Sequence, residues 1–292
     1  MSAAKPAASD SRELRAGEID APAREAFARD GVVCVRGLLG ESALGEARAA
    51  YEWSLANPSP SANVYAGGEG RFYQDLANRK AQPVYRELVH TTPACDAVAA
   101  LWGAPDVWFM YEQVFLKEGG DTRRTPWHQD SSYLPVDGDQ IAVVWICFDA
   151  VAREHSLEFV PGSHRGPMYD GSRFDPSDDT APIYGDGSLP LLPNIEANRG
   201  AWEIVSFAVE PGDAVIFHPG LLHGGAATQA GARRRTLSLR FFGADAHYAR
   251  RPFLTDKQIP EARATSVFQL LSGRLKPGDA FRHPEFPKVR PR

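Results

Sequence analysis

Between residues 107 and 242 the chain is a succession of short β-rich segments separated by glycine and proline turns. The segments are residues 107–117, 140–148, 156–160, 203–209, 214–218 and 235–242. Many short strands with such turns, preceded by helices, are typical of a double-layered β fold. The sequence therefore predicts a mainly β protein: a jelly-roll-like double sheet with flanking N-terminal helices.

Helix formers dominate the part of the chain before this region. Residues 21–30, 41–56 and 83–102 are predicted to be helical, and residues 31–36 form a β-rich run. Residues 1–18 are expected to be a flexible tail.

The rest, residues 19–292, is expected to be a single domain with a lid-like insertion at about 166–200. That insertion is rich in Asp, Pro, Gly and Ser, and a long loop in a compact domain often closes over a site. A short helical patch is predicted at residues 266–271.

Composition excludes several classes of protein. Of the 292 residues 43% are hydrophobic and 24% charged, and the net charge of −5 argues against nucleic-acid and anionic-membrane partners. No apolar run is long enough to span a bilayer, and residues 1–15 lack the apolar core of a secretory signal. The three cysteines, Cys34, Cys95 and Cys147, form no CxxC pair, so we expect core thiols and a cytoplasmic location. No pattern predicts an oligomeric state.

The first candidate site residues are His128 and Asp130, which are two positions apart. On a strand, residues at this spacing point to the same face. An imidazole and a carboxylate form two thirds of the facial triad that holds non-heme Fe(II). By the same alternation Gln129 should point away from the metal.

The third candidate ligand is His223, which small glycine and alanine residues follow. His218 is the alternative, because residues 219 and 220 are Pro and Gly and the relative facing of the two histidines cannot be read from parity. We prefer His223.

Arg234 follows His223 by eleven residues and begins an alternating strand. An oxygenase with open positions on Fe(II) needs electrons, which decarboxylation of a 2-oxo acid supplies. The far carboxylate of a 2-oxo diacid would suit a bidentate guanidinium. Alternation places Arg233 and Arg235 on the other face, and Arg240 on the face of Arg234.

Taken together, these motifs resemble the phytanoyl-CoA dioxygenase family, a branch of the Fe(II)/2-oxoglutarate oxygenases. The resemblance runs from about residue 31 to residue 242, in the order of the family's motifs. It rests on residues 127–130 (Trp-His-Gln-Asp), 157–164 (Leu-Glu-Phe-Val-Pro-Gly-Ser-His), 212–213 with Phe217, 223–224 and 234–235.

The resemblance implies a double-stranded β-helix core of the cupin type and Fe(II), 2-oxoglutarate and O₂ as cofactor and co-substrates. His128, Asp130 and His223 would be the iron ligands and catalytic residues. Arg234 would bind the distal carboxylate of 2-oxoglutarate. Lys117 and Trp145 resemble family positions near the co-substrate.

Other polar and aromatic residues have simpler interpretations. His164 is expected to be a hydrogen-bonded structural residue, and His155 to lie at the surface. Trp108, Phe109 and Tyr111 are expected in the core or the pocket wall. Residues 71–74 are a candidate cover for the mouth of the site.

The predicted function is an Fe(II)- and 2-oxoglutarate-dependent dioxygenase. It would hydroxylate an unactivated C–H bond of a small molecule and convert 2-oxoglutarate to succinate and CO₂. Asp130 favours hydroxylation, because halogenating relatives lack this carboxylate. The alternatives are a non-catalytic cupin-like metal-binding protein and a 2-oxoacid-independent metalloenzyme on the same barrel.

No basic pocket for CoA phosphates is evident. Arg153, Arg240 and Arg250 weakly favour an anionic substrate.

Overall fold

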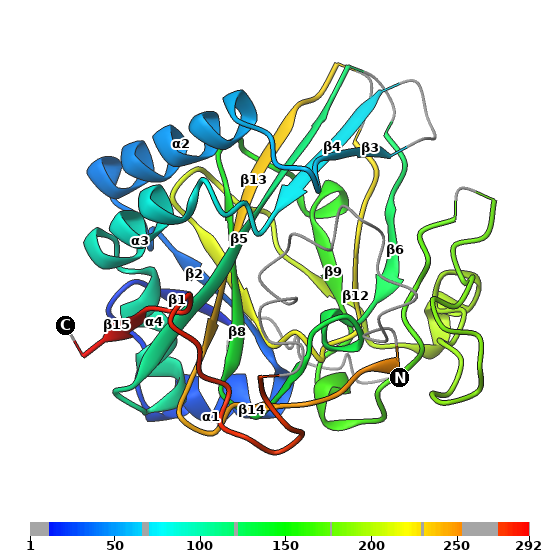
Figure 1. Cartoon of the computed structure of the whole chain (residues 1–292). Helices are drawn as coiled ribbons and strands as arrows, with labels where there is room; N and C mark the ends of the chain where they lie inside the picture. The colour runs from blue at the N-terminus through cyan, green and yellow to red at the C-terminus, as the bar shows by residue number, and fades with distance from the viewer. Residues whose placement is uncertain are drawn as a thin grey trace, which may run out of the picture.

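The computed structural model describes residues 12–65, 70–119, 122–175, 177–228, 231–252 and 274–291. Within these residues two main sheets face each other, and helices cover the outside of the larger one (Figure 1). The predicted double-sheet, mainly β fold is therefore confirmed. The predicted helical patch at 266–271 lies outside the described residues.

The larger sheet has nine strands in the described part of the chain, in the order β1-β2-β11-β8-β13-β5-β4-β3, and β15 also pairs with β5. Their bounds are β1 (Glu13–Arg15), β2 (Val32–Arg36), β3 (Asn63–Tyr65), β4 (Arg71–Leu76), β5 (Val107–Glu118), β8 (Ile141–Cys147), β11 (Ala214–Phe217), β13 (Arg234–Phe242) and β15 (Lys288–Arg290).

The smaller sheet has the order β10-β9-β12-β6, and β7 and β14 form a separate pair. The bounds are β6 (Thr125–His128), β7 (Val136–Asp137), β9 (Leu157–Phe159), β10 (Val205–Ser206), β12 (His223–Gly225) and β14 (His247–Tyr248). Aromatic side chains from both main sheets fill the space between them, among them Trp145, Phe159 and Phe217.

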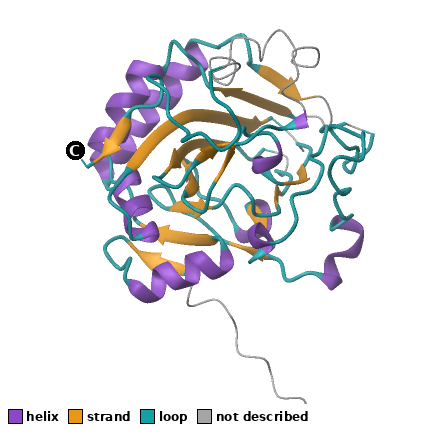
Figure 2. Ribbon diagram, turned by 60° about the horizontal axis from the view of Figure 1, so that its bottom comes forward, coloured by secondary structure: helices purple, strands orange, loops and turns teal. Residues whose placement is uncertain are grey.

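In the described part of the chain, four α-helices lie along the outer side of the larger sheet (Figure 2). They are α1 (Ala21–Asp30), α2 (Glu41–Ala56), α3 (Gln82–Thr91) and α4 (Ala94–Trp102). Tyr51 of α2 and Tyr85 of α3 are fully buried in the core that includes Leu237 and Leu239 of β13. Because successive residues of β13 face opposite sides, this packing leaves the intervening residues facing the smaller sheet.

The ends of α1 follow from its sequence. The Asp20 side chain accepts a hydrogen bond from the Ala23 backbone N–H at 3.0 Å, and Pro22 lies in the first turn. The helix ends at Gly31, whose φ of 75° is in the left-handed region. Gly31 also leaves room for His164, because a Cβ at this position would lie 2.5 Å from the His164 Nδ1 atom.

Two sequence predictions are corrected here. The single helix expected over 83–102 is two helices, because Thr92 before Pro93 is extended (ψ 159°) and ends α3. The flexible tail expected over 1–18 is wrong for Glu13–Arg15, which form β1 parallel to β2. Buried Arg12 anchors this segment through a 2.8 Å ion pair with Asp30. Residues 1–11 are outside the described part.

One irregularity of the larger sheet shapes the site. The β13–β5 ladder pairs Arg240 with Tyr111 and then Phe241 with Phe109, so β5 carries one extra residue here. Such a bulge redirects the neighbouring side chains. Arg240 is paired with Val143 on its other side and faces the space between the sheets.

Candidate metal centre

His128, Asp130 and His223 come together between the two sheets. His128 ends β6 and His223 begins β12, and the two are direct partners in the antiparallel β6–β12 pair. Their ring centroids are 4.2 Å apart. Gln129 is extended (φ −119°, ψ 125°), so Asp130 returns to the same side, and one ligand atom from each of the three residues lies within 4.8 Å of the others. Gln129 itself points away and bonds to the Gly220 carbonyl.

Hydrogen bonds fix which nitrogen of each histidine is free. Nδ1 of His128 lies 2.8 Å from the Pro126 carbonyl, and Nδ1 of His223 lies 2.9 Å from the Leu221 carbonyl. Since a carbonyl oxygen only accepts, both Nδ1 atoms carry the proton and both Nε2 atoms offer lone pairs. Backbone carbonyls orient metal-binding histidines in this way.

The charge of the centre also suits a cation. Burial, together with His128, lowers the pKa of His223 to about 3, which keeps its imidazole neutral. Burial alone would raise the pKa of Asp130, but Arg240 and the two histidines hold it well below its usual range. Asp130 Oδ1 is 3.5 Å from His128 Nε2 and 4.0 Å from His223 Nε2. Two imidazole Nε2 atoms and one carboxylate thus point at one place, a donor set that fits Fe(II).

A second group of charges lies at the far end of β13. Arg234 and Lys117 are direct partners in the β13–β5 ladder, and both are buried. Arg234 Nη1 donates to the His155 carbonyl, and Lys117 Nζ donates to the Arg123 carbonyl at 2.9 Å. Within the described residues neither cation has a carboxylate partner.

Burial of the two cations is unfavourable, and their pKa values show this. Burial lowers the pKa of Arg234 to about 10. Burial, followed by Arg234 and two further arginines, also lowers the pKa of Lys117. An anion placed between two adjacent buried cations would remove this repulsion, so the pair fits the distal carboxylate of a diacid.

A sequence profile described as phytanoyl-CoA dioxygenase matches residues 27–236, which include all three residues of the centre and Arg234. The chain belongs to the phytanoyl-CoA dioxygenase family. The resemblance predicted from the sequence motifs is thereby confirmed.

Individual relatives are more distant. The chain is 30% identical over 163 residues to the human peroxisomal phytanoyl-CoA dioxygenase, covering 54% of this chain and 46% of that protein. It is 28% identical over 187 residues to L-proline trans-4-hydroxylase of Streptomyces griseoviridis, covering 60% and 69%. The matched part thus spans about half the length of the human relative.

Solved structures support the fold. The epimerase SnoN, in complex with Fe³⁺, alpha ketoglutarate and nogalamycin RO, superposes with a TM-score of 0.66 at 21% identity, covering 91% of this chain and 97% of that one.

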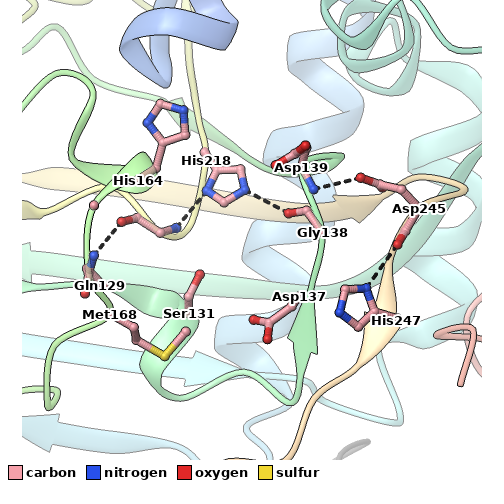
Figure 3. A pocket seen from close by; sticks show the side chains of 12 residues that line it. Gln129, Ser131, Asp137, Gly138, Asp139, His164, Met168, His218, Asp245 and His247 are labelled. Carbon is pink, nitrogen blue, oxygen red and sulfur yellow. Dashed lines mark hydrogen bonds between the residues drawn. The ribbon is translucent and has the colours of Figure 1, made fainter. Parts of the chain in front are cut away.

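His218, the alternative ligand, lies elsewhere in this phytanoyl-CoA dioxygenase family member. It lines a separate cavity of about 460 Å³ together with His164 and His247 (Figure 3). His218 Nδ1 accepts the Gly220 N–H at 3.0 Å, and Nε2 lies 3.2 Å from the Gly138 carbonyl. Both ring nitrogens are therefore engaged away from Asp130. The turn at residues 219–220 separates the two histidines.

The remaining sequence candidates are placed as follows. Trp145 lies on β8 opposite Ser238 and packs with Phe159 and Phe217 between the sheets. A contact with the co-substrate stays a prediction for this residue. Phe72 of β4 lies beside Lys117, whose Nζ is 4.1 Å from its ring centroid, so this segment borders the cation pair.

His164 is a packing residue, as predicted, but its hydrogen bonding is incomplete. Nε2 lies 3.3 Å from the Ala28 carbonyl, whereas Nδ1 is buried against Gly31 and has no hydrogen-bond partner among the described residues. Phe109 and Tyr111 are buried, in agreement with the core or wall prediction. Arg153 is 59% exposed and contacts only Glu13 among its described ion pairs.

Phe174 near the centre was not anticipated. It belongs to the predicted lid segment, and its ring centroid is 5.2 Å from that of His128. Its φ of 57° lies in the left-handed region, which is strained for a bulky residue. Arg123 Nη1 donates to the Phe174 carbonyl at 3.0 Å, and the Phe174 ring stacks on Tyr133. No local pattern in the sequence marks such a contact.

Two further predictions have a structural outcome. The three cysteines are buried, as expected for core thiols. No helix among the described residues is long and apolar enough to cross a membrane. The cytoplasmic location stays a prediction.

Proposed function

We propose that this protein is an Fe(II)- and 2-oxoglutarate-dependent dioxygenase that hydroxylates a C–H bond of a small molecule. The observation that carries the proposal is the presence of two complementary features in one domain. Three acceptors converge at His128, Asp130 and His223, and the larger sheet carries two buried cations, Arg234 and Lys117, that have no carboxylate partner among the described residues.

In this proposal each residue has a defined task. His128, Asp130 and His223 hold the metal, and the carbonyls behind the histidines keep their rings in place. Arg234 binds the distal carboxylate of 2-oxoglutarate, and Lys117 adds a second positive charge. When bound, iron and 2-oxoglutarate supply the oxidation of the C–H bond by O₂, with release of succinate and CO₂.

Hydroxylation is the favoured outcome because Asp130 fills the third protein position at the metal. The described relatives are named for quite different substrates, a CoA thioester and an amino acid. What they have in common is the oxidation of a small molecule. These relatives therefore support hydroxylation of a small molecule without specifying which one.

The segment 166–200 would keep water away from the metal. Phe174 lies against His128, and the Tyr133 hydroxyl donates to the Ser172 carbonyl at 2.7 Å. Glu158 of β9 pairs with Arg199, near the end of the segment, and with Arg124 at 2.9 Å. These contacts would hold the lid over the site as part of one domain spanning residues 19–292.

The test begins with the anaerobic protein, Fe(II) and 2-oxoglutarate. Chelation of the metal by the keto acid should give a visible charge-transfer band, and Asp130→Ala should abolish it. Arg234→Gln should need more 2-oxoglutarate to reach the same band, whereas Arg233→Gln, at an exposed neighbouring position, should not. Succinate release should follow on admission of O₂.

Two results would contradict the proposal. Bound iron without the band would mean that 2-oxoglutarate is not the co-substrate and would favour a metalloenzyme of another type. Tight metal retention with no succinate under any condition would favour a binding protein.

A further inference from the structure

Arg240 is a buried cation whose hydrogen bonding is incomplete. Its Nη2 donates to Gln113 Oε1 at 2.6 Å and to Asp130 Oδ2 at 2.9 Å. Its Nε and Nη1 atoms are buried and have no partner among the described residues. The whole side chain is 5% exposed, so water is also largely excluded.

This state is energetically unfavourable. A buried donor without an acceptor costs on the order of 1–3 kcal/mol, and more when the group is charged. The guanidinium carbon lies 4.7 Å from the centre of the Tyr111 ring, which can stabilise the cation through its face. Stacking does not satisfy the N–H groups, because these point outward in the plane of the guanidinium. Two strong donors, on different edges of the guanidinium, therefore stay without an acceptor among the described residues.

The position of these donors relative to the metal centre is well defined. Asp130 turns Oδ1 toward the two histidines and Oδ2 toward Arg240. Arg240 is thus separated from the metal position by a single carboxylate. The β13 residue assigned to 2-oxoglutarate, Arg234, lies six residues away, or about 20 Å along the strand. The free donors of Arg240 are therefore distinct from the cation pair at the other end of β13.

We propose that one of the unpartnered donors of Arg240, Nε or Nη1, binds a carboxylate oxygen of the primary substrate. This inference rests on the proposed function of the same site. A carboxylate oxygen is the acceptor that a guanidinium prefers, and the pairing would satisfy a buried donor. Because Arg240 lies so close to the metal, the substrate is a small carboxylic acid that is oxidised near its own carboxylate. Arg240 then determines specificity and also positions Asp130.

Binding can be measured without turnover. The anaerobic complex with Fe(II) and saturating 2-oxoglutarate is titrated with short straight-chain and cyclic carboxylic acids, each matched with its primary amide. A ligand next to the metal should shift the charge-transfer band. The expected result is that one or more acids shift the band and that their amides do so at least tenfold more weakly. An absence of response to every acid, or equal responses to acids and amides, would overturn the proposal.

Variants locate the binding group. Arg240→Gln should weaken the acid response at least tenfold, whereas Arg153→Gln, at an exposed site, should leave it unchanged. Arg240→Lys retains a positive charge beside Asp130 but has fewer N–H donors. This variant should therefore keep the charge-transfer band and bind the acid more weakly than the unmodified protein does. Unchanged acid binding in both Arg240 variants would overturn the assignment. Weakened 2-oxoglutarate binding with normal acid binding would also overturn it, since Arg240 would then serve the co-substrate.

The proposed function and this inference fail in different ways. A missing charge-transfer band in the unmodified protein contradicts the 2-oxoglutarate site itself. A normal band with no preference for acids contradicts only the role of Arg240.

Discussion

Glu112 provides a test of the electrostatics behind the site. It lies on β5 between the wall residue Tyr111 and Gln113, is buried, and accepts a hydrogen bond from the Asn78 backbone N–H at 2.8 Å. Burial raises the pKa of Glu112 to about 8 from an ordinary value of 4.5. The folded protein therefore keeps a proton that the unfolded chain has lost at neutral pH.

The sign and size of the effect follow from linkage. Between pH 4.5 and 8 the folded state binds more protons, so stability falls as pH rises through this window. Each pKa unit corresponds to about 1.4 kcal/mol, so Glu112 destabilises the fold by about 3 kcal/mol at pH 7 relative to pH 4.5. Glu112→Gln retains a carbonyl for Asn78 but cannot ionise. The variant should gain stability over the unmodified protein as pH rises, by up to about 1.4 kcal/mol per pH unit.

The measurement is urea unfolding of both proteins at several pH values from 5 to 8, in the metal-free form. Glu25→Gln, at an exposed position of α1, serves as the control and should give a difference that does not change with pH. A constant difference between Glu112→Gln and the unmodified protein across this range would refute the reasoning. Glu112 would then be as well solvated in the folded state as in the unfolded chain.

Three further predictions follow from the same structure. Arg234→Gln should weaken 2-oxoglutarate binding by at least tenfold, because a charge-assisted pair contributes about 1.5–3 kcal/mol; equal titrations of the two proteins would contradict this. Phe174→Ala removes the ring beside His128, so succinate formed without primary substrate should increase as water reaches the metal; an unchanged rate would show that the ring does not exclude water. Asp213→Ala should lower unfolding stability by about 2 kcal/mol in a denaturant titration, because Asp213 bonds to Arg36 at 2.7 Å and to the Gly37 N–H at 2.8 Å; the same midpoint as the unmodified protein would show that solvent replaces these bonds.

Local patterns in the sequence already determined much of the fold. α1 and α2 form over the predicted residues because capping groups, helix formers and apolar spacing all act within a few positions. The division between α3 and α4 was also readable, since Pro93 disfavours helix at the residue before it. The alternation in β13 correctly placed Arg234 and Arg240 on one face.

The candidate metal centre was predictable in part from the sequence and in part only from the tertiary structure. His128 and Asp130 belong together because one extended residue, Gln129, joins them, and the sequence contains that relation in full. Strand pairing favours His223 over His218, because it sets His223 directly opposite His128. The intervening turn at residues 219–220 breaks the alternation on which a sequence argument depends.

Contacts between segments that are distant in the sequence could be identified only from the tertiary structure. The approach of Phe174 to His128 depends on a loop conformation held by Arg123 from another part of the chain. The incomplete hydrogen bonding of Arg240 also depends on packing. Gln113 and Asp130 both accept from Nη2, and burial excludes water from Nε and Nη1. The side chains that could take part in the chemistry were identifiable from the sequence. Their partners, and the donors left free, are determined by packing, because hydrogen-bond satisfaction is a property of the whole buried environment.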